Sequence, residues 1–224
     1  MNKFLVIAFV LFAHHAGYTQ NADALVARIR EKLASVKEYD AIGKLKTDVA
    51  FLKIPLSNVS IHFKYPDQFS IKKEGGISVL PKGGLKISMN SLLADGNFVS
   101  FTAGNINWKG KDLLIVKLVP SVETTDIVIT TLYVEEKTLL IRKAITTTKD
   151  NGTYEMEMEY GKYAQWALPD KAVMSFSIKD YKLPKAITFE YEAGVGPKKE
   201  PKKPLGNKGK VEIIYSSYKI NKKD

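Results

Sequence analysis

Cysteine is absent from the whole chain of 224 residues. Its absence excludes disulfide bonds, thiolate metal sites and cysteine nucleophiles. It also excludes the cleavage-site cysteine through which bacterial lipoproteins receive their lipid anchor. Whatever stabilises this chain must therefore come from packing, hydrogen bonds and ion pairs.

Histidine is nearly absent, and the familiar catalytic motifs are missing. Beyond the leader-like segment over residues 1–19, the only histidine is His62, on the polar face of an expected strand. The sequence has no HExxH, Walker or dinucleotide-binding pattern and no glycine-flanked serine elbow. We therefore expect no enzyme, no cofactor and no metal site. The alternative that stays open is a hydrolase using the row Glu155, Glu157 and Glu159, whose spacing along one strand face is about 7 Å.

The segment over residues 1–19 has the layout of a cleaved secretory signal peptide. Lys3 gives a positive start, an unbroken apolar run follows over residues 4–13, and small and polar residues come next. That run is shorter than the ~20 apolar residues needed to span a bilayer. We expect an exported, periplasmic protein whose remaining residues, 20–224, form a single domain.

The positive charge of the chain is concentrated near its end. The net charge is +10, and residues 195–210 combine six lysines with three prolines. Such a composition is typical of a flexible solvated loop. Nucleic acid is not expected as a partner, because the aromatic side chains lie opposite the charged ones instead of being interleaved with them.

The hydrophobic periodicity changes once along the chain. Leu25, Ile29, Leu33 and Val36 recur at helical spacing, which predicts an amphipathic helix over residues 21–39. After it the period is two. Strands are expected around residues 59–65, 69–73, 114–118, 127–134, 139–148, 154–160, 173–178, 186–192 and 211–220. A second short helix is expected over residues 88–94. With no helices between the strands, the sheet should be antiparallel and meandering.

The apolar strand faces are rich in rings and thioethers. Tyr154, Met156, Met158 and Tyr160 share one face of their strand, and three glutamates occupy the other. The methionine side chain is flexible, so such a face suits hydrophobic ligands of variable shape. The same residues would equally serve as a filled core, and the burial energy per unit area does not distinguish the two.

Several segments resemble the LolA family of periplasmic lipoprotein carriers, and most closely the outer membrane lipoprotein-sorting proteins of Bacteroidetes-type bacteria. The resemblance lies in the order of leader, helix and strand, in the segment Phe63-Lys64-Tyr65-Pro66-Asp67-Gln68-Phe69, and in the hairpin over residues 132–143. It extends to the closing segment over residues 214–221. It implies a half-closed antiparallel β-barrel covered by an N-terminal amphipathic helix and a short lid helix. The best-known members carry an arginine before the motif proline, where this chain has Tyr65.

These observations predict a monomeric, non-catalytic periplasmic carrier. It would bind the acyl chains of lipoproteins or other lipids and meet Lol-type partners at the inner and outer membranes. The alternative is an interaction module with a filled core, whose basic loop contacts a membrane or a partner. The predicted ligand-binding residues are the apolar positions of the expected helices and strands, namely Leu25, Ile29, Leu33, Ile61, Phe63, Phe69, Ile71, Leu92, Leu93, Phe98, Tyr154, Met156, Met158, Tyr160, Phe176 and Phe189.

Overall fold

The computed structural model describes residues 22–48, 56–74, 89, 93, 97–122, 125–150, 152–177 and 208–221. Within these ranges the chain forms one α-helix, a 3₁₀ turn and ten strands. In chain order they are α1 (Ala22–Ala34), β1 (Glu38–Asp48), β2 (Ser57–Lys64), β3 (Gln68–Lys73), β4 (Phe98–Trp108), β5 (Lys111–Pro120), β6 (Ile127–Glu135), β7 (Leu140–Thr148), β8 (Thr153–Glu159), η1 (Ala164–Trp166), β9 (Lys171–Ser177) and β10 (Lys208–Ile220).

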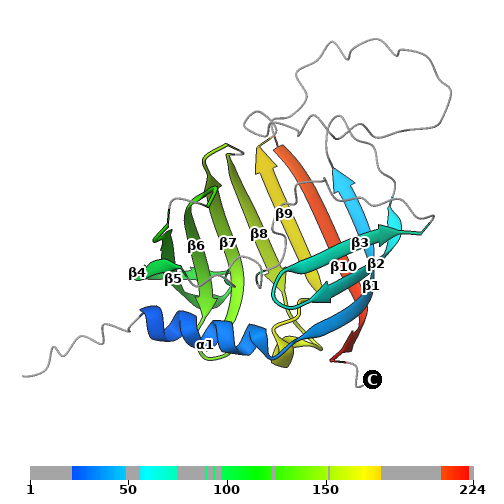
Figure 1. The fold of residues 1–224 in the computed structure, drawn as a ribbon, viewed down its shortest axis with the longest axis horizontal. Coiled ribbons are helices and arrows are strands. Elements are labelled where there is room, and N and C mark those ends of the chain that lie inside the picture. Colours follow the sequence, from blue (N-terminus) through cyan, green and yellow to red (C-terminus); the bar gives the residue numbers. More distant parts are fainter. Residues whose placement is uncertain are drawn as a thin grey trace, which may run out of the picture.

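All ten strands belong to one antiparallel sheet with the order β3-β2-β1-β10-β9-β8-β7-β6-β5-β4. The last strand, β10, inserts between β1 and β9, and every other neighbouring pair is consecutive in the chain. The edge strands β3 and β4 do not pair, so the barrel stays open, and α1 lies across the lower end of the curved sheet (Figure 1). The predicted mainly β, half-closed architecture is confirmed.

The first helix is shorter than predicted. Hydrogen bonds from the Ser35 backbone N–H and hydroxyl to carbonyls of the last turn end it at Ala34, and Tyr39 already lies in β1. The Asn221 side chain, next to β10, holds the junction. Its oxygen accepts from the amides of Lys37 and Glu38 at 2.7 and 3.2 Å, and its nitrogen donates to the Ser35 carbonyl at 2.9 Å. Because Asn221 is far from residues 35–38 in the sequence, the hydrophobic periodicity could not predict where the helix ends.

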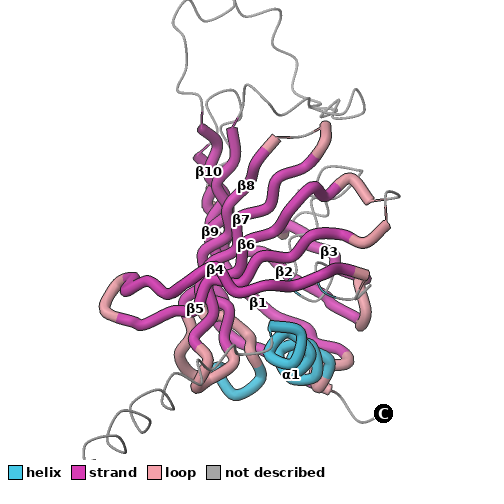
Figure 2. Tube along the Cα trace, turned by 90° about the vertical axis from the view of Figure 1, so that its left-hand side faces the viewer, coloured by secondary structure: helices cyan, strands magenta, loops and turns pink. Residues whose placement is uncertain are grey.

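The alternation predicted for β8 is confirmed. Tyr154, Met156 and Met158 are buried, and the intervening glutamates face the other side of the sheet. We call the side of the sheet that carries these apolar residues and α1 the inner face, and the opposite side the outer face. Figure 2 shows α1 next to the inner face of the curved strands. Tyr160 follows directly after the last residue of β8.

Some predicted segments differ from the structure or lie outside the described residues. β10 begins at Lys208, so residues 208–210 are not loop as predicted, because they extend the pairing with β9. The leader, Leu92, the predicted strand over 186–192 with Phe189, and residues 195–207 lie outside the described ranges. Of the predicted second helix, Met89 and Leu93 are described and helical. β1 and β4 were not predicted.

Register shifts in several strand pairs shape the sheet beyond simple alternation, among them the β1–β10, β4–β5 and β6–β7 pairs. Ile42 pairs with Ser217 and Gly43 with Tyr215, so Ser216 is an extra residue in β10 and forms a β-bulge. The β4–β5 register also shifts between Thr102 and Asn105. The tip of that hairpin reaches across the outer face, where Lys109 contacts Glu157 of β8, four strands away in the sheet order.

Candidate functional site

The inner face holds two apolar clusters side by side. The first lies between α1 and strands β5–β9, and the second lies on β1, β2, β3 and β10. A cavity of about 50 Å³ lies at their junction. Side chains from both clusters and from the η1 region line it, namely Leu33, Tyr39, Phe69, Met89, Met156, Met158, Tyr160, Trp166, Ala167, Leu168, Pro169, Ala172 and Tyr215.

The structure divides the predicted ligand-binding residues between these clusters. Leu25, Ile29, Leu33, Leu93, Met156 and Met158 belong to the first, with Phe98, Tyr160 and Phe176 packed against it. Ile61, Phe63 and Ile71 belong to the second, with Phe69 packed against it. Tyr154 is buried outside both clusters. The cavity itself brings together five of the predicted residues, namely Leu33, Phe69, Met156, Met158 and Tyr160.

Sequence reasoning missed an aromatic group at the cavity. Tyr39 and Tyr215 line it, and both rings contact Tyr218, with centroids 5.3 and 5.0 Å apart. In a regular strand, residues three apart face opposite sides, so Tyr215 and Tyr218 would not meet. The extra residue Ser216 brings both to the inner face. The sequence does show Tyr215 and Tyr218 close together in the closing segment. The bulge that brings both rings to one face depends on pairing with β1, which the segment alone does not reveal.

The tyrosine hydroxyls near the cavity are neutral. Burial raises the pKa of Tyr39, Tyr160 and Tyr215 above the ordinary value of 10.0. The Tyr160 hydroxyl donates to the Ile141 carbonyl at 2.9 Å, and the Tyr218 hydroxyl donates to the Pro169 carbonyl at 2.6 Å. These bonds satisfy polar groups that would otherwise be costly to bury, and leave a lining without formal charge.

An ion pair between buried Arg142 and partly exposed Glu135 lies next to the Tyr160 ring. Arg142 lies with its guanidinium 5.1 Å from the ring centroid, and its Nε donates to Glu135 at 2.7 Å. Burial by itself would raise the pKa of Glu135, but the hydrogen bond and charge of Arg142 outweigh it, so the pKa is lowered. Arg142 is the extra residue where the β6–β7 register shifts. Its guanidinium contacts the ring of Tyr160, which lines the cavity.

Polar contacts attach α1 at both of its ends. Near its start, the Asp23 carboxylate accepts hydrogen bonds from the hydroxyl and the backbone N–H of Ser100 on β4. Near its end, Lys32 Nζ donates to the Thr138 carbonyl in the β6–β7 turn at 2.6 Å. Between these points the helix is held by its apolar face, where Ile29 is fully buried.

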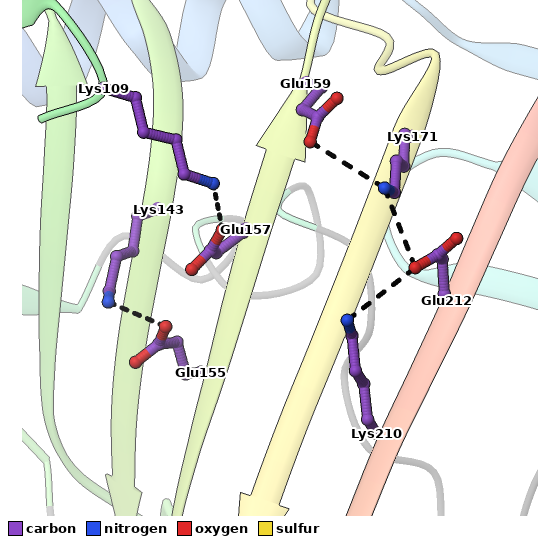
Figure 3. Close-up of polar contacts among 8 residues, drawn as sticks. All are labelled: Lys109, Lys143, Glu155, Glu157, Glu159, Lys171, Lys210 and Glu212. Atoms are coloured by element: carbon purple, nitrogen blue, oxygen red, sulfur yellow. Dashed lines mark hydrogen bonds and ion pairs between the residues drawn. The ribbon is translucent and has the colours of Figure 1, made fainter. Parts of the chain in front are cut away.

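The glutamate row of β8 forms ion pairs on the outer face. Lys143 lies 2.7 Å from Glu155 and Lys109 lies 2.7 Å from Glu157. Lys171 lies between Glu159 and Glu212 (Figure 3). Burial tends to raise the pKa of Glu157, but the hydrogen bond and charge of Lys109, together with Glu155 and Lys143, outweigh it and the pKa is lowered. A general acid needs the opposite shift.

The described residues offer no assembled metal or serine-hydrolase site. Nowhere in those ranges do three or more His, Asp or Glu side chains gather as a metal would require. His62 Nδ1 lies 2.9 Å from the Asp40 carboxylate on the outer face. The hydrogen bonds of the described part of the chain include none from a serine hydroxyl to His62. No described helix is long and apolar enough to span a membrane.

Comparisons with known proteins identify the fold. No family model matches the sequence, and no curated protein matches it. Solved structures that match most of the chain include the following three. A LolA superfamily protein from Nitrosomonas europaea has a TM-score of 0.56 at 10% identity, with 91% of this chain and 95% of that chain covered. A putative outer membrane lipoprotein-sorting protein domain from Vibrio parahaemolyticus has 0.54 at 9% identity, covering 90% and 93%. A DUF1329 family protein from Desulfovibrio piger has 0.57 at 12% identity, covering 91% and 93%. The chain has the fold of the LolA superfamily.

Proposed function

We propose that this protein is a non-catalytic periplasmic carrier that shields acyl chains of lipoproteins or other lipids between α1 and the inner face of the sheet. The observation that supports it most is the uncharged cavity at the junction of the two clusters, lined by Met156 and Met158 and roofed in part by Leu33. The LolA-type fold and the leader-like segment over residues 1–19 point the same way. Transport towards the outer membrane is proposed by analogy with the putative outer membrane lipoprotein-sorting protein domain that shares this fold.

The cavity must enlarge before it can hold an acyl chain. Its volume of about 50 Å³ is well below the ~300 Å³ at which pockets for small molecules begin. The described conformation is therefore the closed form in this proposal. Flexible methionine side chains can repack around a ligand, but most of the space must come from movement of α1.

The free-energy cost of moving α1 away from the sheet is similar in size to the gain from burying an acyl chain. Opening exposes the four large apolar side chains on the buried face of α1, which are Leu25, Val26, Ile29 and Leu33. At about 1.5–3 kcal/mol each, their exposure costs roughly 6–12 kcal/mol. An acyl chain of about fifteen methylenes contributes roughly 12 kcal/mol on burial at ~0.8 kcal/mol per methylene. Ligand binding can thus offset displacement of the helix.

The proposal is tested by a fluorescent fatty-acid probe and by native mass spectrometry of gently purified protein. Met158→Glu places a charge in the cavity wall and should weaken probe binding by at least about tenfold. The matched control is Val128→Glu, which adds the same charge at a side chain that is 46% exposed. Leu33→Trp, which fills the cavity without a charge, should also reduce binding.

Each result bears on the proposal. Folding of each variant is checked by near-UV circular dichroism, so that loss of structure is not mistaken for loss of the site. Unchanged probe affinity in both folded cavity variants would contradict the proposed location. Absence of probe binding and of co-purified lipid in the wild-type protein would contradict the carrier function itself.

The small size of the cavity favours one alternative function, an interaction module whose inner face is a filled core. In that case the wild-type protein would bind no probe and carry no lipid. Deletion of residues 195–207 would then abolish a salt-dependent association with anionic vesicles.

A further inference from the structure

The outer face divides into two electrically different halves. On β7, β8 and β9, with the first part of β10, the glutamates are matched by lysines (Figure 3). On β1, β2, β3 and the end of β10, the outward lysines Lys44, Lys64, Lys72 and Lys219 form no ion pair with any described residue. Lysines without an ion pair to a described residue therefore gather on this half of the face, where Glu38 lies opposite Lys64 and Asp40 opposite Lys219 in the strand register.

A groove of about 370 Å³ lies on this half of the face. It is lined by Asp40, Ala41, Ile42, Ser60, Ile61, His62, Ser70, Lys72, Ser217 and Lys219. The strand register explains why these residues meet. His62 pairs with Asp40 on one side and with Ser70 on the other, and Asp40 pairs in turn with Lys219. Four neighbouring strands thus contribute one continuous polar row.

We propose that this groove binds the phosphate group of a phosphate ester. Lys72 and Lys219 supply ammonium donors, while Ser70 and Ser217 supply hydroxyl donors at the same groove. Charge-assisted bonds of this kind are the usual means of holding phosphate oxygens. The one carboxylate in the lining, Asp40, is hydrogen-bonded to His62. An ester is favoured over the free ion because Ile42, which is 58% exposed, offers an apolar contact for the organic part.

The groove is separate from the proposed acyl site. Ala41 and Ile61 lie between them and have their side chains in the second inner cluster, so the sheet itself divides the two sites. A phosphate ester held outside cannot be the head group of an acyl chain held inside. The groove would take either a soluble phosphate ester or the head group of a lipid in a bilayer that the protein approaches with its outer face.

The test measures binding of glycerol 1-phosphate by calorimetry and of phosphatidylglycerol vesicles by co-flotation, with phosphatidylcholine vesicles as the neutral comparison. The variant Lys72→Gln/Lys219→Gln should weaken binding about tenfold, equivalent to about 1.4 kcal/mol. The matched control Lys117→Gln/Lys137→Gln removes the same charge outside the groove. Ile42→Glu keeps both lysines, adds a carboxylate at the groove and should also weaken binding.

The two arms distinguish the sources of phosphate. Binding of glycerol 1-phosphate without vesicle binding supports a soluble ester, and vesicle binding that glycerol 1-phosphate displaces supports a lipid head group. The proposal is overturned if neither probe binds saturably, or if the control double variant loses as much affinity as the groove variant.

Discussion

Gly43→Ala tests whether the β10 backbone beside the bulge at Ser216 is held rigidly against β1. A Cβ at position 43 would lie 2.6 Å from the Ile214 carbonyl oxygen and 3.4 Å from the Tyr215 Cα, against an ordinary contact distance of 3.4–4 Å. The nearest atom is backbone in the middle of a ten-stranded sheet, so no side-chain rotation can relieve the clash. Overpacking of a rigid interior costs about 1–3 kcal/mol, and we expect the upper part of that range.

The effect is measured by urea unfolding, where about 2–3 kcal/mol corresponds to a midpoint shift of about 1 M for a protein of this size. The near-UV signal of the stacked Tyr215 and Tyr218 should change as well, because the bulge sets their common face. Ile42→Ala, at a side chain that is 58% exposed in the same strand, is the control and should cost less than about 1 kcal/mol. If Gly43→Ala lost less than about 0.5 kcal/mol, as an ordinary surface substitution does, and left the tyrosine signal unaltered, the β10 backbone would not be held rigidly against Gly43.

Two further predictions concern the outer face and the attachment of α1. Because Lys109 lowers the pKa of Glu157 below its unfolded value of 4.5, the ion pair stabilises the fold above that pH and loses its effect as pH falls through the folded pKa. The stability difference between wild type and Lys109→Gln, below about 1 kcal/mol, should therefore be present at pH 7 and shrink as the pH is lowered below 4.5 in urea titrations; a difference that stays constant down to acid pH would contradict this. Ser100→Ala removes a hydroxyl donor to Asp23 and should speed hydrogen exchange of the α1 amides up to about fivefold, whereas Glu31→Ala on the exposed face of α1 should not. Equal exchange rates in the two variants would argue against this attachment.

The hydrophobic periodicity of single segments was enough to predict those helices and strands that bury one face. The period-two alternation of residues 154–160 predicted which side chains of β8 face inward, because a strand exposes alternate residues to opposite sides. The spacing of Leu25, Ile29 and Leu33 likewise predicted the buried face of α1. β4 was not predicted because it is an edge strand: Val99, Phe101 and Ile106 are exposed, so no alternation marks it.

Composition and periodicity were enough to establish the class of the protein: a cysteine-free β chain with one leading amphipathic helix, an apolar inner surface and a glutamate row facing away from it. Those properties depend on which residues are present and on how they alternate along one segment. Pairing between distant strands set the position of β10 between β1 and β9, the meeting of Tyr39, Tyr215 and Tyr218, and the row of Asp40, His62 and Ser70. Register and bulges are imposed by the partner strand, so neither segment alone carries that information.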